Sequence, residues 1–445
     1  MTDYLFILGK NWTLSIAELL VSLGDLRIDF KVKDYSRTSV VIETDRQFTD
    51  EELVEIQAGL GGCFKTGRVV TSYELGLILR AFPRRGRIVK EAREKLEECS
   101  WLGKVWPRPA GARIKYGVST YPAAKDSPVD LGKLTLGLDE FIKRRLTQLG
   151  AKKASYYAYE GPDKRKPERP STALWPQTIA LHSLLVPPNA EILAALTTER
   201  MYLARTIAVY DSLFQRHRDE SRPYISAQIS TSPKLCRTLL TLSGAKPGCT
   251  VLDPFCGTGT ILMEAAVLDM RCIGVDNSHD AVQGARRNMV WLAKEMGEQL
   301  VFRIEHGDAR KLPETVKEQV DAVAFEPDLG PVYEEAPSRE EAESSVAQLT
   351  ELYRDCLVSL QSVLRPGGRV GMTVPVVVSK QGPVLVNLDK MVENTAFTVH
   401  TLLPREVFPD SVKNREVAIR PERTRLPERK RGQIVQREVL MLGLD

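Results

Sequence analysis

The chain has 445 residues, of which 43% are hydrophobic and 27% are charged, and its formal net charge is +4. This length predicts two to four domains with ample core, and the composition is typical of a soluble globular protein rather than a disordered or fibrous one. No apolar run approaches the ~20 residues of a membrane helix, and the first residues lack the pattern of an export signal. The 7 cysteines are scattered and include no CxxC pair, so we expect neither a metal site nor a disulfide framework. This cysteine pattern favours a reducing, cytoplasmic location.

Residues 1–74 are predicted to form a small domain with the element order βαββαβ, which is the ferredoxin-like arrangement. A first helix is expected from Ser15, with Glu18 three residues later as its capping box. A second helix is expected from Thr49, with Glu52 in the equivalent place. The four expected strands lie at residues 3–8, 28–33, 39–44 and 63–70.

Residues 75–185 are predicted to form a second α+β domain, followed by a semi-rigid linker at 186–225 that includes a helix at 190–196. The expected elements of this domain are a basic helix after residue 87, strands at 112–119, 154–159 and 175–185, and a helix at 134–146. Many cations lie here beside aromatic residues, which favours contact with RNA phosphates. They are Arg84, Arg85, Arg87, Lys143, Arg144, Arg145, Lys152, Lys153, Lys164, Arg165, Lys166 and Arg169.

Residues 226–445 open with a helix at Ser232-Pro233-Lys234-Leu235 and continue into a buried strand that ends in a glycine-bearing turn. Gly257 and Gly259 let the backbone approach a ligand closely, and free N–H groups open the helix that follows. A second strand ends on Asp276, nineteen positions after Gly257, a spacing that suits a carboxylate reaching ribose hydroxyls. The pattern predicts a nucleotide-sized ligand at this turn.

Two further strands end on polar residues at the same predicted edge. The strand at 301–304 leads to Gly307-Asp308, and the strand at 321–325 leads to Glu326-Pro327-Asp328-Leu329. A helix at 340–364, a fifth strand at 369–374 and an antiparallel edge hairpin of 397–400 with 434–442 are expected to complete the sheet. An arginine-rich insertion between the last two strands is a second candidate for phosphate contact; its cations are Arg415, Arg420, Arg423, Arg425, Arg429, Lys430 and Arg431.

The series from Asp253-Pro254-Phe255-Cys256-Gly257-Thr258-Gly259-Thr260 to the fourth strand resembles the S-adenosylmethionine-dependent class I methyltransferase domain, in the version that methylates exocyclic amines of nucleic-acid bases. The resemblance implies an α/β, Rossmann-like domain with a seven-stranded sheet. It also implies that Asp276 holds the ribose and that Asp308 accepts a hydrogen bond from the adenine amino group. The implied cofactor-binding residues are Asp253, Phe255, Gly257, Gly259, Thr260, Asp276, Asp308 and Ala309.

The segment Gly117-Val118-Ser119-Thr120-Tyr121 resembles the THUMP domain, an RNA-binding module of tRNA-modifying enzymes. The order of ferredoxin-like unit, THUMP-like domain, Arg222-Pro223-Tyr224, Pro233-Lys234-Leu235 helix and catalytic domain is similar to the archaeal and eukaryotic tRNA guanosine-10 N2-methyltransferase family. That family implies tRNA as the partner, and some of its members work with a small zinc-containing activator protein.

A guanine N2 amine is a poor nucleophile, so the site must accept its hydrogen bonds while the nitrogen attacks the methyl group. The resemblance assigns this role to Glu326, Pro327 and Asp328. The family has proline and an aromatic residue where this chain has Asp328 and Leu329, so base stacking falls to Tyr333 or Tyr224. Three functions remain: methylation of a guanosine amine in tRNA, which the retained cofactor residues favour; methylation of another base or of DNA; and RNA binding without catalysis.

Overall fold

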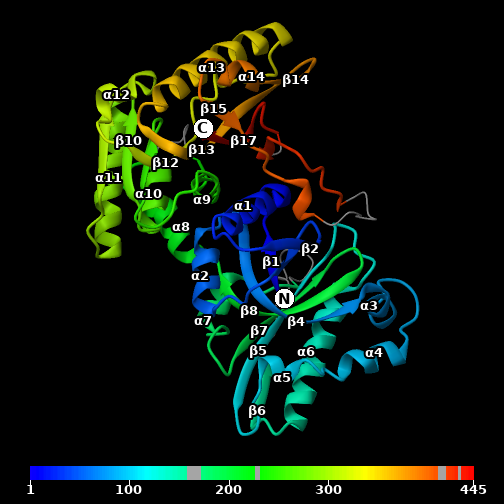
Figure 1. The fold of residues 1–445 in the computed structure, drawn as a ribbon. Coiled ribbons are helices and arrows are strands. Elements are labelled where there is room, and N and C mark those ends of the chain that lie inside the picture. The colour runs from blue at the N-terminus through cyan, green and yellow to red at the C-terminus, as the bar shows by residue number, and fades with distance from the viewer. Residues whose placement is uncertain (158–171, 226–230, 409–416, 429–431, 445) are drawn as a thin grey trace.

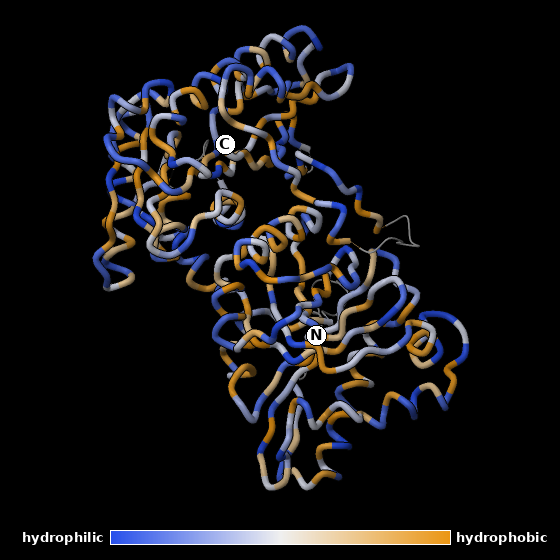
Figure 2. The backbone as a smooth tube through the Cα atoms, viewed as in Figure 1, coloured by the Kyte–Doolittle hydropathy of each residue, from blue (hydrophilic) through white to orange (hydrophobic). Residues whose placement is uncertain are grey.

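The computed structural model describes residues 1–157, 172–225, 231–408, 417–428 and 432–444. In this part of the chain the strands form two sheets, and each sheet organises one lobe (Figure 1). We call residues 1–209 the front half and residues 212–444 the back half. Apolar residues follow the strands of both lobes, and the long outer helices alternate between apolar and polar residues (Figure 2).

The first unit of the front half has the predicted βαββαβ order, and its strands pair in the order β2-β3-β1-β4. Its elements are β1 (Thr2–Leu8), α1 (Trp12–Gly24), β2 (Phe30–Tyr35), β3 (Ser39–Thr44), α2 (Asp50–Gly59) and β4 (Cys63–Glu74). Helix α2 carries the expected capping box: Glu52 N–H donates to Thr49 Oγ1 at 3.1 Å, and Thr49 N–H donates to Glu52 Oε2 at 2.8 Å. These contacts satisfy two N–H groups that the helix itself leaves without acceptors.

The predicted cap of α1 at Ser15 is wrong, because the helix already begins at Trp12. Ser15 and Glu18 are both buried within the helix. The Glu18 carboxylate instead accepts the N–H groups of Gly61 and Gly62, each at 2.7 Å. An S-x-x-E pattern therefore marks a tertiary contact here rather than the start of the helix.

The rest of the front half continues the same sheet. Its elements are α3 (Leu75–Ala81), α4 (Lys90–Glu97), α5 (Leu102–Val105), β5 (Arg113–Tyr121), α6 (Leu131–Gln148), β6 (Lys153–Tyr156), α7 (Pro176–Leu181), β7 (Ala190–Leu196) and β8 (Arg200–Val209). The full order is β2-β3-β1-β4-β8-β7-β5-β6, and β4 and β8 pair antiparallel from Lys65 with Val209 to Glu74 with Arg200. The two predicted front units thus share one eight-stranded sheet.

The predicted linker at 186–225 is wrong over most of its length. Residues 190–196, expected as a helix, form β7, and β8 follows, so both strands lie at the centre of the sheet. All seven residues of β7 are buried, because the strand is covered on both faces. A continuous apolar run of this kind does not distinguish a buried strand from a helix by its periodicity.

The expected strand at 175–185 is also wrong, since this segment contains helix α7. Pro176 occupies the first turn of α7, where its missing N–H costs no hydrogen bond.

The back half begins with two helices and then builds a sheet in the order β11-β10-β9-β12-β13-β17-β15. Its elements are α8 (Ser212–Ser221), α9 (Pro233–Leu242), β9 (Thr250–Asp253), α10 (Thr260–Val267), β10 (Arg271–Asp276), α11 (His279–Met296), β11 (Phe302–His306), a 3₁₀ turn η1 (Ala309–Lys311), α12 (Leu312–Thr315), β12 (Val320–Phe325), α13 (Arg339–Leu360), β13 (Leu364–Ser379), β14 (Gly382–Leu385), α14 (Leu388–Val392), β15 (Phe397–Val399), η2 (Arg405–Val407), β16 (Leu426–Glu428) and β17 (Val435–Leu444). The predicted seven-stranded sheet is present, and β14 and β16 are paired to its strands as additions. Strand β17 lies antiparallel between β13 and β15.

Two core clusters lie on the two faces of this sheet. One contains residues of α13 and α14. The other contains residues of α9, α10 and α11 and continues without a break into α1 and α2 of the front half. In the described part of the chain, no helix is long and apolar enough to cross a membrane.

Candidate active site

The glycine turn and Asp276 meet at the carboxyl ends of the parallel strands. Gly257 has φ +48° and Gly259 has φ +81°, a region that residues with a Cβ rarely adopt. Gly257 N–H donates to Asp276 Oδ2 at 2.8 Å, and Ser278 N–H donates to Asp276 Oδ1 at 2.9 Å. These two contacts hold the carboxylate of Asp276 beside the turn.

Three carboxylates from different strand ends share this region. Asp253 ends β9 and is 1% exposed, and its Oδ1 accepts the Phe255 N–H at 3.0 Å. Burial raises the pKa of Asp253 well above its usual value, and the nearby charges of Asp276 and Glu326 raise it further. Strand β9 pairs in parallel with both β10 and β12, so Asp253, Asp276 and Glu326 lie at the same edge of the sheet, as predicted.

Phe255 and Thr260, on either side of the glycine turn, contact other elements of the back half. The Phe255 ring stacks on Phe325 with 5.5 Å between centroids and 24° between planes. Thr260 begins α10 and is buried, and its Oγ1 accepts from the Arg222 guanidinium at 3.2 Å. The Arg-Pro-Tyr segment is thereby attached to the first turn of α10.

Asn288, which sequence reasoning missed, completes this attachment from α11. Its Oδ1 accepts the Tyr224 N–H at 2.9 Å, and its Nδ2 donates to the carbonyls of Tyr224 and Thr258 at 2.9 and 2.8 Å. The Tyr224 ring lies against Gly284, where a Cβ would approach it to 2.1 Å. Tyr224 is therefore packed on α11, and an asparagine on an otherwise ordinary amphipathic helix gives no motif by which to find this role.

Asp308 and Ala309 lie after β11, and both contact neighbouring residues of the protein. Asp308 caps η1 through the Arg310 N–H at 2.9 Å and also pairs with the Arg310 side chain at 2.7 Å. Hydrogen bonds from Arg310 lower the pKa of Asp308. Ala309 is 6% exposed and packs in the core.

Glu326 follows β12 and both of its carboxylate oxygens have partners. Arg437 on β17 pairs with Oε1 through its Nε, and the Thr231 hydroxyl donates to Oε2. The side chains of Arg437 and Glu326 are 16% and 11% exposed. A carboxylate and a guanidinium thus form a largely buried pair at the predicted catalytic position.

The residues after Glu326 take different positions. Pro327 is buried and Asp328 is exposed, with Asp328 Oδ1 accepting the Gly330 N–H at 2.9 Å. The Asp328 carbonyl accepts from the buried Tyr353 hydroxyl. The loop is thus held from α13, and the Asp328 carboxylate faces solvent.

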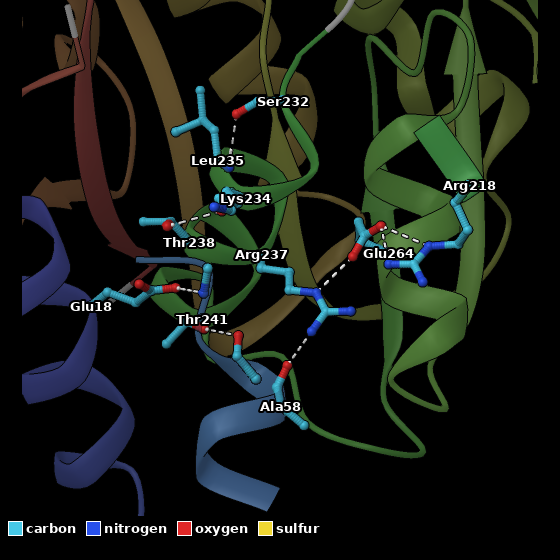
Figure 3. Close-up of polar contacts among 12 residues, drawn as sticks. Glu18, Ala58, Arg218, Ser232, Lys234, Leu235, Arg237, Thr238, Thr241 and Glu264 are labelled. Carbon is cyan, nitrogen blue, oxygen red and sulfur yellow. Dashed lines mark hydrogen bonds and ion pairs between the residues drawn. The ribbon is translucent and has the colours of Figure 1, made fainter. Parts of the chain in front are cut away.

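The two halves meet at a buried junction formed by α2, α8, α9 and α10 (Figure 3). Glu264 Oε1 accepts from Arg218 at 2.7 Å, and its Oε2 accepts from Arg237 at 2.6 Å. A second arm of Arg237 donates to the Ala58 carbonyl at the end of α2. Because Glu264 lies on the helix that follows the glycine turn, the junction connects the front half directly to the predicted ligand site.

Close backbone contact makes this junction tight. A Cβ on Gly61 would lie 1.9 Å from the Lys234 carbonyl oxygen and 3.1 Å from Arg237 Cβ. Thr241 Oγ1 donates to the Gly59 carbonyl at 3.3 Å. Lys234 lies over the Phe64 ring at 4.1 Å, and burial lowers its pKa.

Several predicted phosphate-contacting cations have partners inside the protein. Arg144 pairs with Glu97, Arg145 donates to Gln148 at 3.1 Å, and Lys143 lies over the Tyr156 ring at 5.8 Å. Arg425 pairs with Glu438 at 3.3 Å. Outside the described residues lie Lys164, Arg165, Lys166, Arg169, Arg415, Arg429, Lys430 and Arg431.

Comparison with known proteins finds two family models. The model described as "RMKL-like, methyltransferase domain" matches residues 222–380, and one described as "DNA methylase" matches residues 91–287. Each covers less than half of the chain.

Curated relatives carry methyltransferase names. The chain is 34% identical over 214 residues to "tRNA (guanine(10)-N2)-dimethyltransferase" of Methanothermobacter thermautotrophicus, covering 48% of this chain and 59% of the relative. It is 29% identical over 163 residues to the protein of the same name from Pyrococcus abyssi, covering 36% of this chain and 44% of the relative. The chain thus spans less than two thirds of the length of these relatives.

Among solved structures, TrmN from Thermus thermophilus is similar over 100% of both chains, with a TM-score of 0.51 and 18% sequence identity. At this identity the likeness concerns the fold. Together with the strand order of the back half, it shows that this chain has the α/β fold of class I methyltransferases.

Proposed function

We propose that this protein is an S-adenosylmethionine-dependent RNA methyltransferase that methylates the exocyclic N2 amine of a guanosine in tRNA, of the position-10 type, in the cytoplasm. The observation that carries the proposal is the meeting of the glycine turn, Asp276 and Glu326 at one edge of a class I methyltransferase sheet. The names of the relatives support the choice of tRNA and of the guanine N2 atom.

The residues at the turn fit the cofactor. Around Gly257 a Cβ would find no atom closer than the Phe255 carbonyl at 4.0 Å, so the turn has an open side. Each oxygen of Asp276 accepts one backbone N–H and keeps a lone pair for a ribose hydroxyl. Gly257, Gly259 and Asp276 would hold the cofactor, which supplies an electrophilic methyl group.

The chain's own residues supply hydrogen-bond acceptors for the amine. A neutral amino group conjugated to a purine gains nucleophilicity when its N–H groups donate hydrogen bonds to acceptors, and after the methyl group is transferred the nitrogen releases one proton to solvent. We assign the accepting role to the Glu326 carboxylate and the Pro327 carbonyl. Asp328 is exposed and one of its carboxylate oxygens accepts the Gly330 N–H, so we place it at the solvent side of the site.

The front half is proposed to bind the tRNA. It carries Arg84, Arg85 and Arg87 in an exposed loop, and the buried junction holds it against the back half. Exposed arginines favour phosphate contacts whose strength falls with salt.

The proposal is tested with unmodified tRNA, the chain alone and cofactor carrying a deuterated methyl group, followed by mass spectrometry of the nucleosides. The expected product is labelled N2-methylguanosine, and its formation by the chain alone would show that a zinc-containing activator protein is not required. Glu326→Ala should abolish the label, with Asp328→Asn as the matched control that retains it.

Two other results would replace this proposal. Label in another nucleoside, or only in DNA, would favour a different target, as the match to a DNA methylase model suggests. Calorimetric binding of the cofactor without label in tRNA, rRNA or DNA, with or without an activator, would favour an RNA-binding protein without catalysis.

A further inference from the structure

Glu326 is held by two contacts that come from outside its own motif. Arg437 lies on β17, and Thr231 lies just before α9. Neither residue is adjacent in sequence to the strand β12 that carries Glu326. Strand β17 runs antiparallel to β13, which in turn pairs with β12, so Arg437 reaches across the sheet to the end of β12.

A glutamate at this position needs such support more than an aspartate would. Its carboxylate is attached through one additional rotatable bond, so the free side chain samples more conformations. Catalysis requires the accepting oxygen to stay where the amine will be. Arg437 and Thr231 each engage one oxygen and together leave little freedom to the carboxylate.

These two contacts also leave the Glu326 carboxylate able to accept further hydrogen bonds. Each carboxylate oxygen has two lone pairs, and the two contacts occupy one on each oxygen. Counting partners among the described residues alone, one acceptor position remains on Oε1 and one on Oε2. The amine of a bound base can use these positions without displacing Arg437 or Thr231.

The charge of Arg437 has a second effect at this edge. Asp253 is fully buried and lies near both Asp276 and Glu326. Negative charges that share a site repel one another. The Arg437 guanidinium places a positive charge in direct contact with one of these three carboxylates and so offsets part of that repulsion.

We propose that Arg437 is a positioning residue of the methyl-transfer site: its guanidinium, with the Thr231 hydroxyl on the other oxygen, holds the Glu326 carboxylate oriented to accept hydrogen bonds from the substrate amine. The inference rests on the proposed function and deepens it. It also explains how a glutamate can accept hydrogen bonds at a position where the family that this chain resembles has a shorter acidic or amide residue.

The test measures kcat, KM for tRNA and cofactor affinity for Arg437→Gln, Arg437→Lys and Thr231→Val. Arg437→Gln should lower kcat by between about tenfold and a hundredfold, the range expected for a misplaced catalytic group, with KM for tRNA and cofactor affinity near wild type. Arg437→Lys keeps the charge but not the planar donor group, so it should recover part of kcat. Thr231→Val should have the smaller effect, because it removes one hydrogen bond from an uncharged donor and leaves the guanidinium in place.

The control is Arg339→Gln on α13, which removes an exposed guanidinium paired with Glu343 at 2.7 Å. It should leave kcat and KM unchanged, since exposed pairs of this kind contribute little. Thermal unfolding of all variants shows whether a loss of kcat accompanies a loss of folded protein.

A double-mutant cycle distinguishes positioning from a general structural role. If Arg437 acts through Glu326, Arg437→Gln should change the residual kcat of Glu326→Gln by less than about threefold, since the residues act as one unit. Effects that multiply in the double variant would overturn the inference. So would a loss confined to KM, or an unchanged kcat in Arg437→Gln. Absence of product with the wild-type protein would instead refute the proposed function.

Discussion

Replacing Glu264 by glutamine should destabilise the protein more than any change of an exposed charge. Glu264 is 1% exposed, and its two oxygens accept from the buried guanidinium groups of Arg218 and Arg237 at 2.7 and 2.6 Å. A glutamine offers one acceptor oxygen and turns an amide N–H toward the other guanidinium. Breaking a buried ion pair by removing one partner costs about 3–5 kcal/mol.

This cost can be converted into a shift of the unfolding temperature. With an unfolding entropy of about 2.1 cal/mol/K per residue, 1 kcal/mol corresponds to roughly 1 °C for a chain of this length, so Tm should fall by about 3–5 °C if the whole chain unfolds in one transition. The fall should be about twice as large if the back half unfolds by itself. Differential scanning calorimetry measures both the shift and the number of transitions.

The matched control is Glu351→Gln, which neutralises an exposed glutamate of α13. Substitutions at such positions usually change stability by less than about 0.5 kcal/mol. If Glu264→Gln lowered Tm no more than Glu351→Gln, the Arg218–Glu264–Arg237 cluster would not stabilise the junction and the reasoning would be refuted.

Three further variants test the site and the front half. Gly259→Ala places a Cβ at φ +81° and 3.2 Å from Ala285 Cβ, so stability should fall by about 1–2 kcal/mol and cofactor binding, measured by calorimetry, should weaken; unchanged binding would contradict the role of the turn. Asp276→Asn should weaken cofactor binding at least about tenfold, because a hydrogen bond to a charged group contributes about 1.5–3 kcal/mol, and equal affinity would remove Asp276 from the site. Burial raises the pKa of Asp139 from 3.8 to about 8, so the folded protein keeps a proton that the unfolded chain releases, and stability should decline as pH rises from about 4 to 8. Asp139→Asn should remove that decline, so that its Tm relative to wild type increases between pH 5 and pH 8; a constant difference would show that Asp139 titrates normally.

The strand ends of the back half were predictable because parallel strands place their carboxyl ends together. Asp253, Asp276 and Glu326 each follow a short apolar run, and that order alone predicts a common edge. The capping box at Thr49 was predictable for a similar reason, since both of its partners lie within one helical turn.

What sequence could not supply are contacts between distant segments. Arg437 is 111 positions from Glu326, and Asn288 is 64 from Tyr224. The segment of β7 is predicted as a helix because a strand buried on both faces lacks the alternation of apolar and polar residues that identifies strands. The prediction for Glu18 is wrong because the sequence pattern S-x-x-E is the same for a helix cap and for a buried carboxylate that accepts the N–H groups of Gly61 and Gly62.

The pairing of β4 with β8 bears on how the front half responds to cleavage of the chain. The exposed loop at 84–89 offers several arginines to trypsin and joins segments on either side of that pairing. A cut there would separate β1–β4 covalently from the remainder, yet the ladder with β8 and the contact of α2 with α9 would keep the fragments together. The nicked protein should therefore elute as a single species under native conditions and divide into two only in denaturant.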